Sequence, residues 1–258
     1  MPPISLDSLR AHLDALLDPE RRDDYGPNGL QVAATELDAP IERVVVGVTA
    51  NLELIDAAVA ARADALVVHH GLYWHGAPYT LTGPLGRRVR RLMASGVSLL
   101  AYHLPLDGHP EVGNAVALAR ALGAVDPAPS FPYKGGATGC VARFDPPIAP
   151  ETLAERLHAT VSDRALVFPH GPAAIATVGV VTGGAPRSVR EAIDQGLDAF
   201  ITGEAGEYSL ATAREEGIHF AAAGHHRTER FGPAALAERL AADLPGLDVR
   251  FIDIDNPA

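Results

Sequence analysis

Two adjacent histidines, His69 and His70, close an apolar run from Ala65 to Val68. The run lies between Asp64 and Gly71 and is typical of a short buried strand in a parallel sheet, beyond whose carboxyl end ligand groups gather. Because neighbouring strand residues point to opposite faces, one ion cannot easily bind both rings, whereas two nearby ions could bind one each. The pair therefore favours a dinuclear metal site. The structural alternative is one buried, hydrogen-bonded histidine beside a solvated one.

A second source of ligands follows an apolar strand predicted from Val97 to Ala101. Asp107 comes after this strand, in a loop that precedes a helix expected to open near Glu111. Its carboxylate is a candidate metal ligand, and helix capping is the alternative role.

A third source follows the apolar run at residues 221–223. His225 and Glu229 stand four residues apart, and the next helix is expected to have its cap near Arg227 or Thr228. Metal ligation and a structural cap both fit this pair. The three places together supply nitrogen and oxygen ligands without a thiolate: His69, His70, Asp107, His225 and Glu229. Such a set suits Zn²⁺, Mn²⁺, Fe²⁺, Co²⁺ or Ni²⁺ and argues against iron–sulfur and zinc-finger chemistry.

Several short segments, spread over nearly the whole chain, together point to one protein family, although no single segment would do so. They are GPNGLQV from Gly26, VVVGVTA from Val44, DALVVHHGLYWHG from Asp64, YHLPLDGHPEVGNA from Tyr102, DAFITGE from Asp198 and AAGHHRTERFG from Ala222. Together they resemble the GTP cyclohydrolase I type 2 family, also called NIF-three-like or dinuclear metal centre proteins. The closing FIDIDNPA from Phe251 resembles the shorter bacterial members.

The resemblance implies how the ligands divide between two divalent ions per chain. His69, Asp107 and Glu229 would hold one ion, His70 and His225 the other, and Glu229 would bridge them. It also implies a ring-shaped homohexamer whose metal sites face an interior space, and it implies a purine nucleotide substrate with opening of the GTP ring.

Composition points to a cytoplasmic protein. Apolar residues make up 47% of the 258 residues, yet no run approaches the ~20 residues of a membrane helix, and no signal peptide is visible. The single cysteine, Cys140, excludes an intramolecular disulfide and is expected to be buried. A formal charge of −11 opposes binding to nucleic acid. The arginines of residues 87–91, on a helix expected from Leu85 to Ala94, are interpreted as a solvated face, and a subunit contact or a phosphate-attracting rim is the alternative.

An internal repeat organises the chain. Val44–His70 aligns without gaps over Val178–Glu204, matching Asp64 to Asp198, and both copies predict strand, helix, strand. Each copy is followed by a further helix and a strand, the helices at Leu85–Ala94 and Glu207–Glu216 and the strands opening at Gly96 and Gly217.

The repeat predicts an α/β fold of two related domains with mainly parallel sheets and the metal site in the cleft between them. Residues 1–125 would form the first domain, with His69, His70 and Asp107. Residues 126–258 would form the second, with His225 and Glu229, and the C-terminal strand is a candidate to return to the first. Asp126–Pro132 is the expected linker, Gly135–Phe144 an edge strand and Leu153–Thr160 a short helix.

Weaker signals surround these elements. His103 and His109 flank Asp107 and are candidate proton shuttles. Trp74 and its neighbours offer either an aromatic wall for a planar base or core packing. Glu204 occupies the repeat position of His70 and is a candidate for the pocket wall. Asn28-Gly29 predicts a structural turn, with substrate contact as the alternative, and Thr182-Gly183-Gly184 is too short for a phosphate-binding loop.

These features favour a dinuclear metal-dependent hydrolase acting on a nucleotide or a related small molecule. Two ions would activate a water and polarise the bond to be cleaved. A protein that stores, delivers or senses metal, or a ring-shaped scaffold, is the alternative. The two interpretations differ in whether the metal-loaded protein turns over a substrate.

Overall fold

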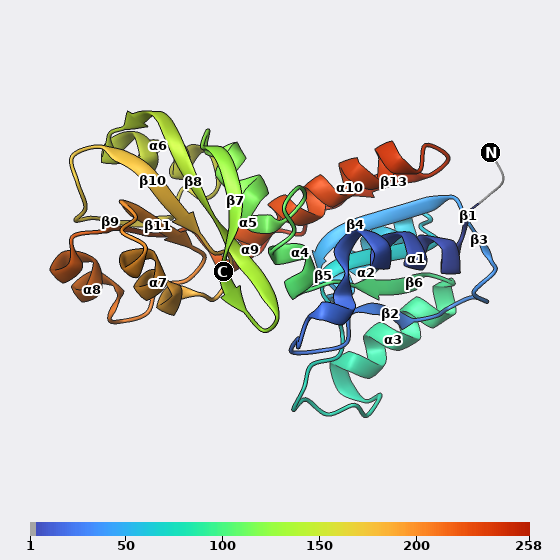
Figure 1. Ribbon diagram of the computed structural model, residues 1–258. Coiled ribbons are helices and arrows are strands. Elements are labelled where there is room, and N and C mark those ends of the chain that lie inside the picture. The colour runs from blue at the N-terminus through green and yellow to red at the C-terminus, as the bar shows by residue number, and fades with distance from the viewer. Residues whose placement is uncertain (1–3) are drawn as a thin grey trace. The chain divides into compact units, whose positions relative to one another are not determined.

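The computed structural model describes residues 4–258 (Figure 1). The chain forms two compact units. Unit 1 contains the residues up to Leu106 together with Pro233–Asp255, and unit 2 contains Asp107–Gly232 and Asn256–Ala258. The chain thus passes from unit 1 to unit 2 after Leu106, earlier than the boundary expected after residue 125. The reason is that helix α5, Asn114–Ala121, packs on strands β7 and β8 of unit 2. The division falls within α4, Leu104–Asp107, and within α10, Phe231–Asp243.

Unit 1 is built on a five-stranded sheet of order β13-β4-β5-β6-β2. The first four strands are parallel and β2 is antiparallel at the edge. The bounds are β2 Gly29–Val32, β4 Arg43–Thr49, β5 Ala65–His70, β6 Ser98–Ala101 and β13 Asp248–Phe251; β1 Ile4–Ser5 and β3 Pro40–Ile41 form a separate two-stranded pair. The valine- and leucine-rich central strands are buried on both faces, as parallel strands usually are.

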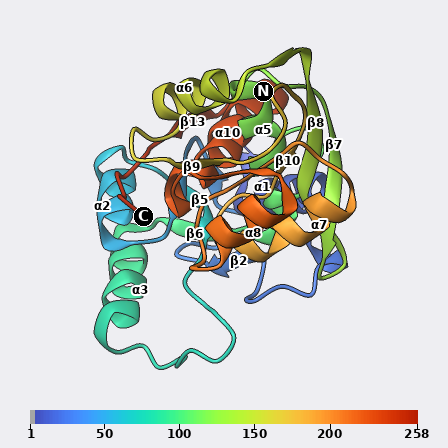
Figure 2. The same ribbon diagram turned by 90° about the vertical axis from the view of Figure 1, so that its left-hand side faces the viewer.

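Helices cover the sheet of unit 1. Their bounds are α1 Leu6–Leu17, α2 Leu52–Ala60 and α3 Gly83–Ser95, with a short 3-10 turn at Pro19–Arg21. Helix α1 buries four leucines at spacings of three and four, which places them on one helical face. Helices α2 and α3 contact each other (Figure 2) and share one hydrophobic cluster with the sheet residues Val45, Leu66 and Leu99.

Unit 2 contains a six-stranded mixed sheet of order β7-β8-β10-β11-β12-β9, in which β10, β11 and β12 are parallel. The strands are β7 Val125–Tyr133, β8 Gly136–Ile148, β9 Leu166–Pro169, β10 Ile175–Val180, β11 Ala199–Thr202 and β12 His219–Ala222. The helices are α5, α6 Pro150–Thr160, α7 Val189–Asp194, α8 Ser209–Glu216 and α9 His225–Glu229, with a 3-10 turn at Pro186–Ser188.

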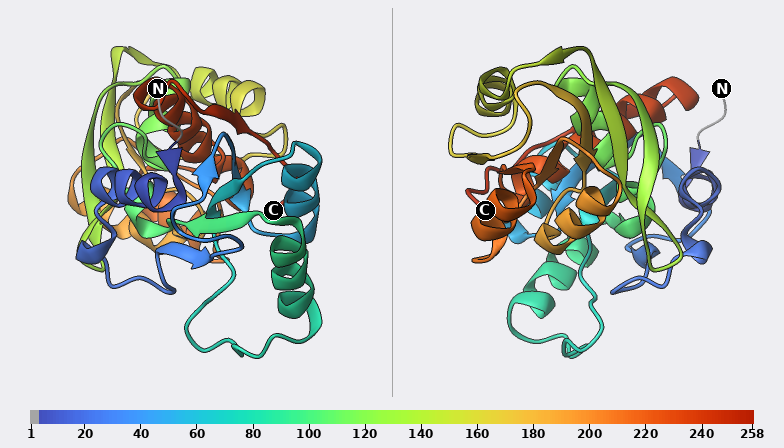
Figure 3. Two further views of the ribbon diagram at one scale, coloured as in Figure 1. Left: turned by 90° about the vertical axis from the view of Figure 1, so that its right-hand side faces the viewer. Right: turned by 60° about the vertical axis from the view of Figure 1, so that its left-hand side comes forward.

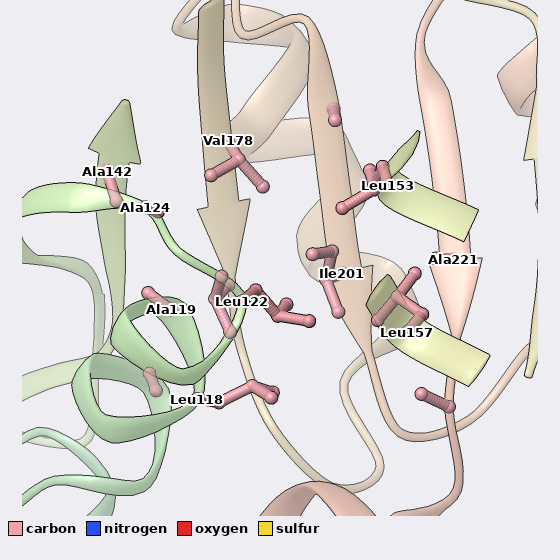
Figure 4. Packing of buried hydrophobic residues seen from close by; sticks show 14 of the residues in the cluster. Leu118, Ala119, Leu122, Ala124, Ala142, Leu153, Leu157, Val178, Ile201 and Ala221 are labelled. Atoms are coloured by element: carbon pink, nitrogen blue, oxygen red, sulfur yellow. The ribbon is translucent and has the colours of Figure 1, made fainter. Parts of the chain in front are cut away.

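Two hydrophobic clusters, one on each face of this sheet, hold unit 2 together. Leu118 and Leu122 of the α5 region and Leu157 of α6 pack toward Val178 and Ile201 on one face (Figure 4). On the other face, residues of α7 and α8 pack against the phenylalanines of β7, β11 and β12. Cys140 lies in the first cluster, where burial raises the pKa of its thiol to about 12, and this confirms its expected apolar role.

Two sequence predictions in this region are wrong. The proline-rich segment Asp126–Pro132 is not a linker but most of strand β7. Strand β7 is an edge of the sheet (Figure 3, right), a position that tolerates proline because one side of the strand needs no amide donors. Consequently Gly135–Phe144 is not an edge strand, since β8 lies between β7 and β10. If copies of this chain pair through a sheet edge in this region, the strand that offers the edge is β7 and not β8.

The internal repeat is confirmed element by element. Strand β4, helix α2 and strand β5 correspond to β10, α7 and β11, and the predicted following helices and strands are α3 and β6 in one copy and α8 and β12 in the other. The matched aspartates also do the same work. Asp64 Oδ2 accepts the backbone amides of Glu42 and Arg43, and Asp198 Oδ2 accepts those of Ala176 and Thr177. Each aspartate thereby ties the start of its strand to the strand before it.

No helix within residues 4–258 combines the length and apolar character needed to cross a membrane.

Candidate metal-binding side chains

His69 and His70 lie at the carboxyl end of β5, beyond its last pairing with β6. Their ring centroids are 4.5 Å apart, and with His103 they offer ligand atoms that all lie within 4.8 Å of one another. The two rings thus lie close together, which is compatible with one ion on each ring. His70 is the last residue of β5 and is still paired with Thr49 of β4.

Partners on the ring fix which nitrogen of each histidine can bind an ion. His69 is fully buried, and its Nδ1 donates to the carbonyl oxygen of Tyr102 at 3.2 Å. His70 Nδ1 is hydrogen-bonded to Thr49 Oγ1 at 3.0 Å. With Nδ1 engaged, Nε2 is the nitrogen that each ring can offer to a metal, an arrangement that is usual for metal-binding histidines.

His103 is held in the same way by a buried carboxylate. Its Nδ1 lies 2.7 Å from Oδ1 of Asp24, whose other hydrogen bonds come from Asn28 Nδ2 and from the amides of Tyr25 and Leu104. Burial raises the pKa of Asp24, but the hydrogen bond and charge of His103, with the bonds from Asn28 and Tyr25, lower it to about 2. Asp24 is thus a rigid, charged acceptor.

Trp74 closes one side of this cluster. Its ring meets the His103 ring edge-on at a centroid distance of 5.1 Å and lies 6.0 Å from the His70 ring. Trp74 thus packs against the imidazoles, whereas the ring of Tyr73 lies beside that of Tyr79.

In unit 2, helix α9 brings His225 and Glu229 together. The helix begins at His225, not at the expected Arg227 or Thr228, and Gly224 occupies the N-cap position. Residues four apart share a helical face, so His225 Nε2 lies 3.2 Å from Oε2 of Glu229. Glu229 is only 3% exposed.

A glycine makes room for this carboxylate. Gly183 has φ +67°, and a Cβ built there would lie 2.1 Å from Glu229 Oε1 and 3.2 Å from His225 Nε2. The backbone amide of Gly183 donates to Thr228 Oγ1 at 3.0 Å, which fixes the loop beside α9. The segment Thr182-Gly183-Gly184, too short for a phosphate-binding loop, therefore forms a cradle for Glu229.

His225 is bound on both ring nitrogens by carboxylates. Its Nδ1 lies 2.6 Å from Oε1 of Glu204, the residue expected at the pocket wall. The hydrogen bond to Glu229 is the largest influence on the pKa of His225; burial opposes it, the charges of Glu229 and Glu204 add to it, and the pKa rises to about 9. Without an ion, this imidazole keeps a proton at neutral pH, and a cation would compete with that proton.

Asp107 is the last residue of the one-turn helix α4, where a loop was expected. It is 7% exposed, and its Oδ1 accepts from Asn114 Nδ2 at 2.9 Å and from Thr182 Oγ1 at 3.4 Å. Asn114 Oδ1 in turn accepts the amide of Gly232. The nearest ligand oxygens of Asp107 and Glu229 lie within 4.8 Å of each other.

His109, the other candidate proton shuttle, is engaged in its own turn. Its Nδ1 accepts the amides of Glu111 and Val112, both at 3.1 Å. This is a local structural role.

The predicted ligands thus form two sets, His69 and His70 in unit 1 and Asp107, His225 and Glu229 in unit 2. Sequence reasoning missed Asp24, which holds His103, and Thr49, which holds His70, and it did not predict the role of Gly183 beside Glu229. Imidazole and carboxylate donors around a glycine cradle fit a divalent transition-metal ion.

The fold and these donors define an α/β protein with groups suited to divalent metals. The chain belongs to the Duf34/NIF3 (NGG1p interacting factor 3) family, whose sequence profile matches residues 4–257. Relatives from Vibrio cholerae and Allochromatium vinosum are 45% and 43% identical over 96% and 97% of this chain, and over 98% and 96% of their own lengths. Both relatives carry the name GTP cyclohydrolase 1 type 2 homolog. The resemblance seen in the sequence is confirmed.

Solved structures agree with this assignment. Protein ybgI, described as of unknown function, is 38% identical with a TM-score of 0.91, covering 99% of this chain and 100% of its own. A protein from Thermus thermophilus is 34% identical with a TM-score of 0.87 and the same coverage. Reduced HcgD from Methanocaldococcus jannaschii shares the fold at 22% identity, with a TM-score of 0.83 over 97% of this chain and 98% of its own.

Proposed function

We propose that this protein holds two divalent metal ions per chain. In this proposal His69, Asp107 and Glu229 bind one ion, His70 and His225 bind the other, and Glu229 bridges both.

The observation that carries the proposal is the pair of buried carboxylates in unit 2. Asp107 and Glu229 are 7% and 3% exposed, and their nearest ligand oxygens lie within 4.8 Å. Burying two such groups side by side is costly because each loses solvation and each repels the other. A divalent cation between them removes both costs, and imidazoles complete a ligand set of the kind that Zn²⁺, Mn²⁺, Fe²⁺, Co²⁺ or Ni²⁺ prefers.

The reaction we propose is hydrolysis of a nucleotide or a related small molecule, in line with the name of the curated relatives. When bound, two divalent ions supply Lewis acidity to a substrate oxygen. The chain's own contribution would be to orient and enclose the substrate, with Trp74 as a wall at the imidazole cluster and His103 or His109 as candidates to move a proton.

Metal content tests the binding proposal directly. Reconstituted protein should contain about two ions per chain by elemental analysis. Glu229→Gln should weaken both ions together, because a neutral amide of the same shape bridges two cations poorly. Glu207→Gln, which changes an exposed carboxylate of the same unit, is the matched control and should retain both ions. One ion or none in the reconstituted parent protein would reject the dinuclear proposal.

A substrate panel separates the enzyme from its alternative. The metal-loaded protein should convert at least one member of a set of nucleotides and phosphoesters, read by mass spectrometry. The alternative is a protein that stores, delivers or senses metal, or a ring-shaped scaffold. Full metal content without any turnover would favour it.

We also propose a cytoplasmic homohexamer. The exposed edge strand β7 is a surface through which copies could pair. Light scattering at micromolar concentration should give six times the chain mass, and a monomer would reject this part of the proposal. Cell fractionation tests the location.

A further inference from the structure

Unit 1 contains three imidazoles around one point, and only two of them belong to the proposed ligand set. The ligand atoms of His69, His70 and His103 lie within 4.8 Å of one another. The His103 ring centroid is 5.0 Å from that of His69 and 5.6 Å from that of His70. His103 is thus as much a part of the cluster as the two adjacent histidines.

The internal repeat gives His103 a counterpart. His103 follows β6, which ends at Ala101, and Asp107 stands four residues later; His225 follows β12, which ends at Ala222, and Glu229 stands four residues later. Both copies thus place a histidine just after the third strand of the repeat and a buried carboxylate one helical turn further on. His225 is a proposed ligand, and His103 occupies nearly the same place in the other copy, two residues after its strand where His225 is three residues after.

The two histidines are also oriented alike. His103 Nδ1 is 2.7 Å from the carboxylate of Asp24, as His225 Nδ1 is 2.6 Å from that of Glu204. A carboxylate on Nδ1 fixes the ring and directs Nε2 to a ligand, which is the usual support of a metal-bound imidazole. Asp24 has only 2% of its side chain exposed and receives four hydrogen bonds, so it holds the ring in one orientation.

We infer that His69, His70 and His103 form a three-imidazole site in unit 1 that binds one late transition-metal ion. This inference deepens the proposed metal function and rests on it. The donors are neutral nitrogens, so the site selects late transition metals such as Cu²⁺, Ni²⁺, Co²⁺ or Zn²⁺ and rejects Mg²⁺ and Ca²⁺. His103 acts in this site as a ligand and not as a proton carrier.

Counting imidazoles on one bound ion tests this site. Cu²⁺ is added to the metal-free full-length protein at half an equivalent, and pulsed electron paramagnetic resonance counts the coordinated imidazole nitrogens. The parent protein should show three. His103→Ala should show two and bind this Cu²⁺ about tenfold or more weakly, because losing a direct ligand should cost at least as much as losing its orienting partner.

Matched variants identify which histidines contribute. His225→Ala should still show three imidazoles, and so should His109→Ala, whose ring belongs to a local turn. Asp24→Asn should keep the count at three while lowering the affinity. If His103→Ala leaves three imidazoles, or if His225→Ala reduces the count, the ion is not held by this cluster.

The outcome is distinct from a failure of the dinuclear proposal, which is judged from ion content at saturation. A parent protein that binds two ions while His103→Ala leaves the imidazole count unchanged would overturn only the three-imidazole site. Variants that do not fold are recognised by far-ultraviolet circular dichroism. In that case His103→Gln, which retains a polar side chain beside Asp24, gives the same imidazole count test.

Discussion

Replacing Gly183 by alanine should displace the carboxylate of Glu229 and weaken metal binding. The new Cβ would lie 2.1 Å from Glu229 Oε1, whereas ordinary contact begins at 3.4 Å, so the oxygen must move by about 1.3 Å (3.4 − 2.1). The same Cβ would lie 3.2 Å from His225 Nε2. A shift of this size moves the proposed bridging ligand out of bonding range, since metal–ligand distances in proteins vary by only about 0.2 Å.

The backbone also contributes, and a matched glycine isolates that part. Gly183 has φ +67°, and Gly196 has φ +68° with nothing within 4 Å of the Cβ position. Alanine at either glycine should cost about 1–2 kcal/mol for the left-handed conformation. Only at Gly183 should it add a clash with Glu229. The difference between the two variants therefore measures the displacement of the carboxylate.

The expected loss of metal affinity in Gly183→Ala is about ten- to hundredfold, the scale of losing a group that orients a metal ligand. This corresponds to about 1.4–2.7 kcal/mol of binding free energy. Competition with a chromogenic chelator measures the affinity, and chemical denaturation of the metal-free proteins measures the backbone cost. Gly196→Ala should bind metal like the parent. If Gly183→Ala also does, the cradle does not position Glu229 for an ion.

Three further predictions concern neighbouring groups. The metal-free protein should lose stability as pH rises, because the pKa of His225 is about 9 in the folded protein against 6.5 ordinarily. The stabilisation from the protonated His225 is complete below about pH 6.5 and is lost as the pH rises through 9. Chemical denaturation at both pH values checks this, and His225→Asn should flatten the dependence. Glu204→Gln should lower metal affinity about ten- to hundredfold while the far-ultraviolet circular dichroism stays that of the parent, as calorimetric titration would show; unchanged affinity would mean that Glu204 does not orient His225. Asp64→Asn and Asp198→Asn should each destabilise the protein by about 1.5–3 kcal/mol without changing its metal content, and a large difference between the two would contradict their equivalence in the repeat.

The candidate ligands could be predicted from the sequence because each follows a strand that its apolar residues reveal locally. His69 and His70 end a run that is fully buried, and His225 follows another, so strand ends alone select them. The predicted start of α9 is wrong because Gly224 occupies the N-cap position, where glycine and threonine are about equally favoured and the sequence alone does not decide between Gly224 and Thr228. Such errors of a few residues do not move a ligand from its strand end.

The supporting residues could not be predicted, because their roles depend on pairing between distant segments. Asp24 meets His103 only because β2 pairs with β6 and Asn28 bonds to the His103 amide. Nothing near Asp24 in the sequence indicates this. The prolines of β7 misled in the opposite direction, since their local preference for a linker is overridden at the edge of a sheet.

The repeat also explains why the two copies support their ligands differently. An offset of 134 residues (178 − 44) relates Thr49 to Gly183 and His70 to Glu204. In unit 1 the threonine side chain holds His70, which is itself a candidate ligand. In unit 2 the equivalent position has no side chain, and Glu229 fills that space while Glu204, the counterpart of His70, holds His225. The same backbone thus presents an imidazole directly in one copy and supports an imidazole and a carboxylate from α9 in the other. Placing threonine at position 183 would restore the side chain of unit 1 at the expense of the Glu229 position, so the two copies cannot both use the arrangement of unit 1.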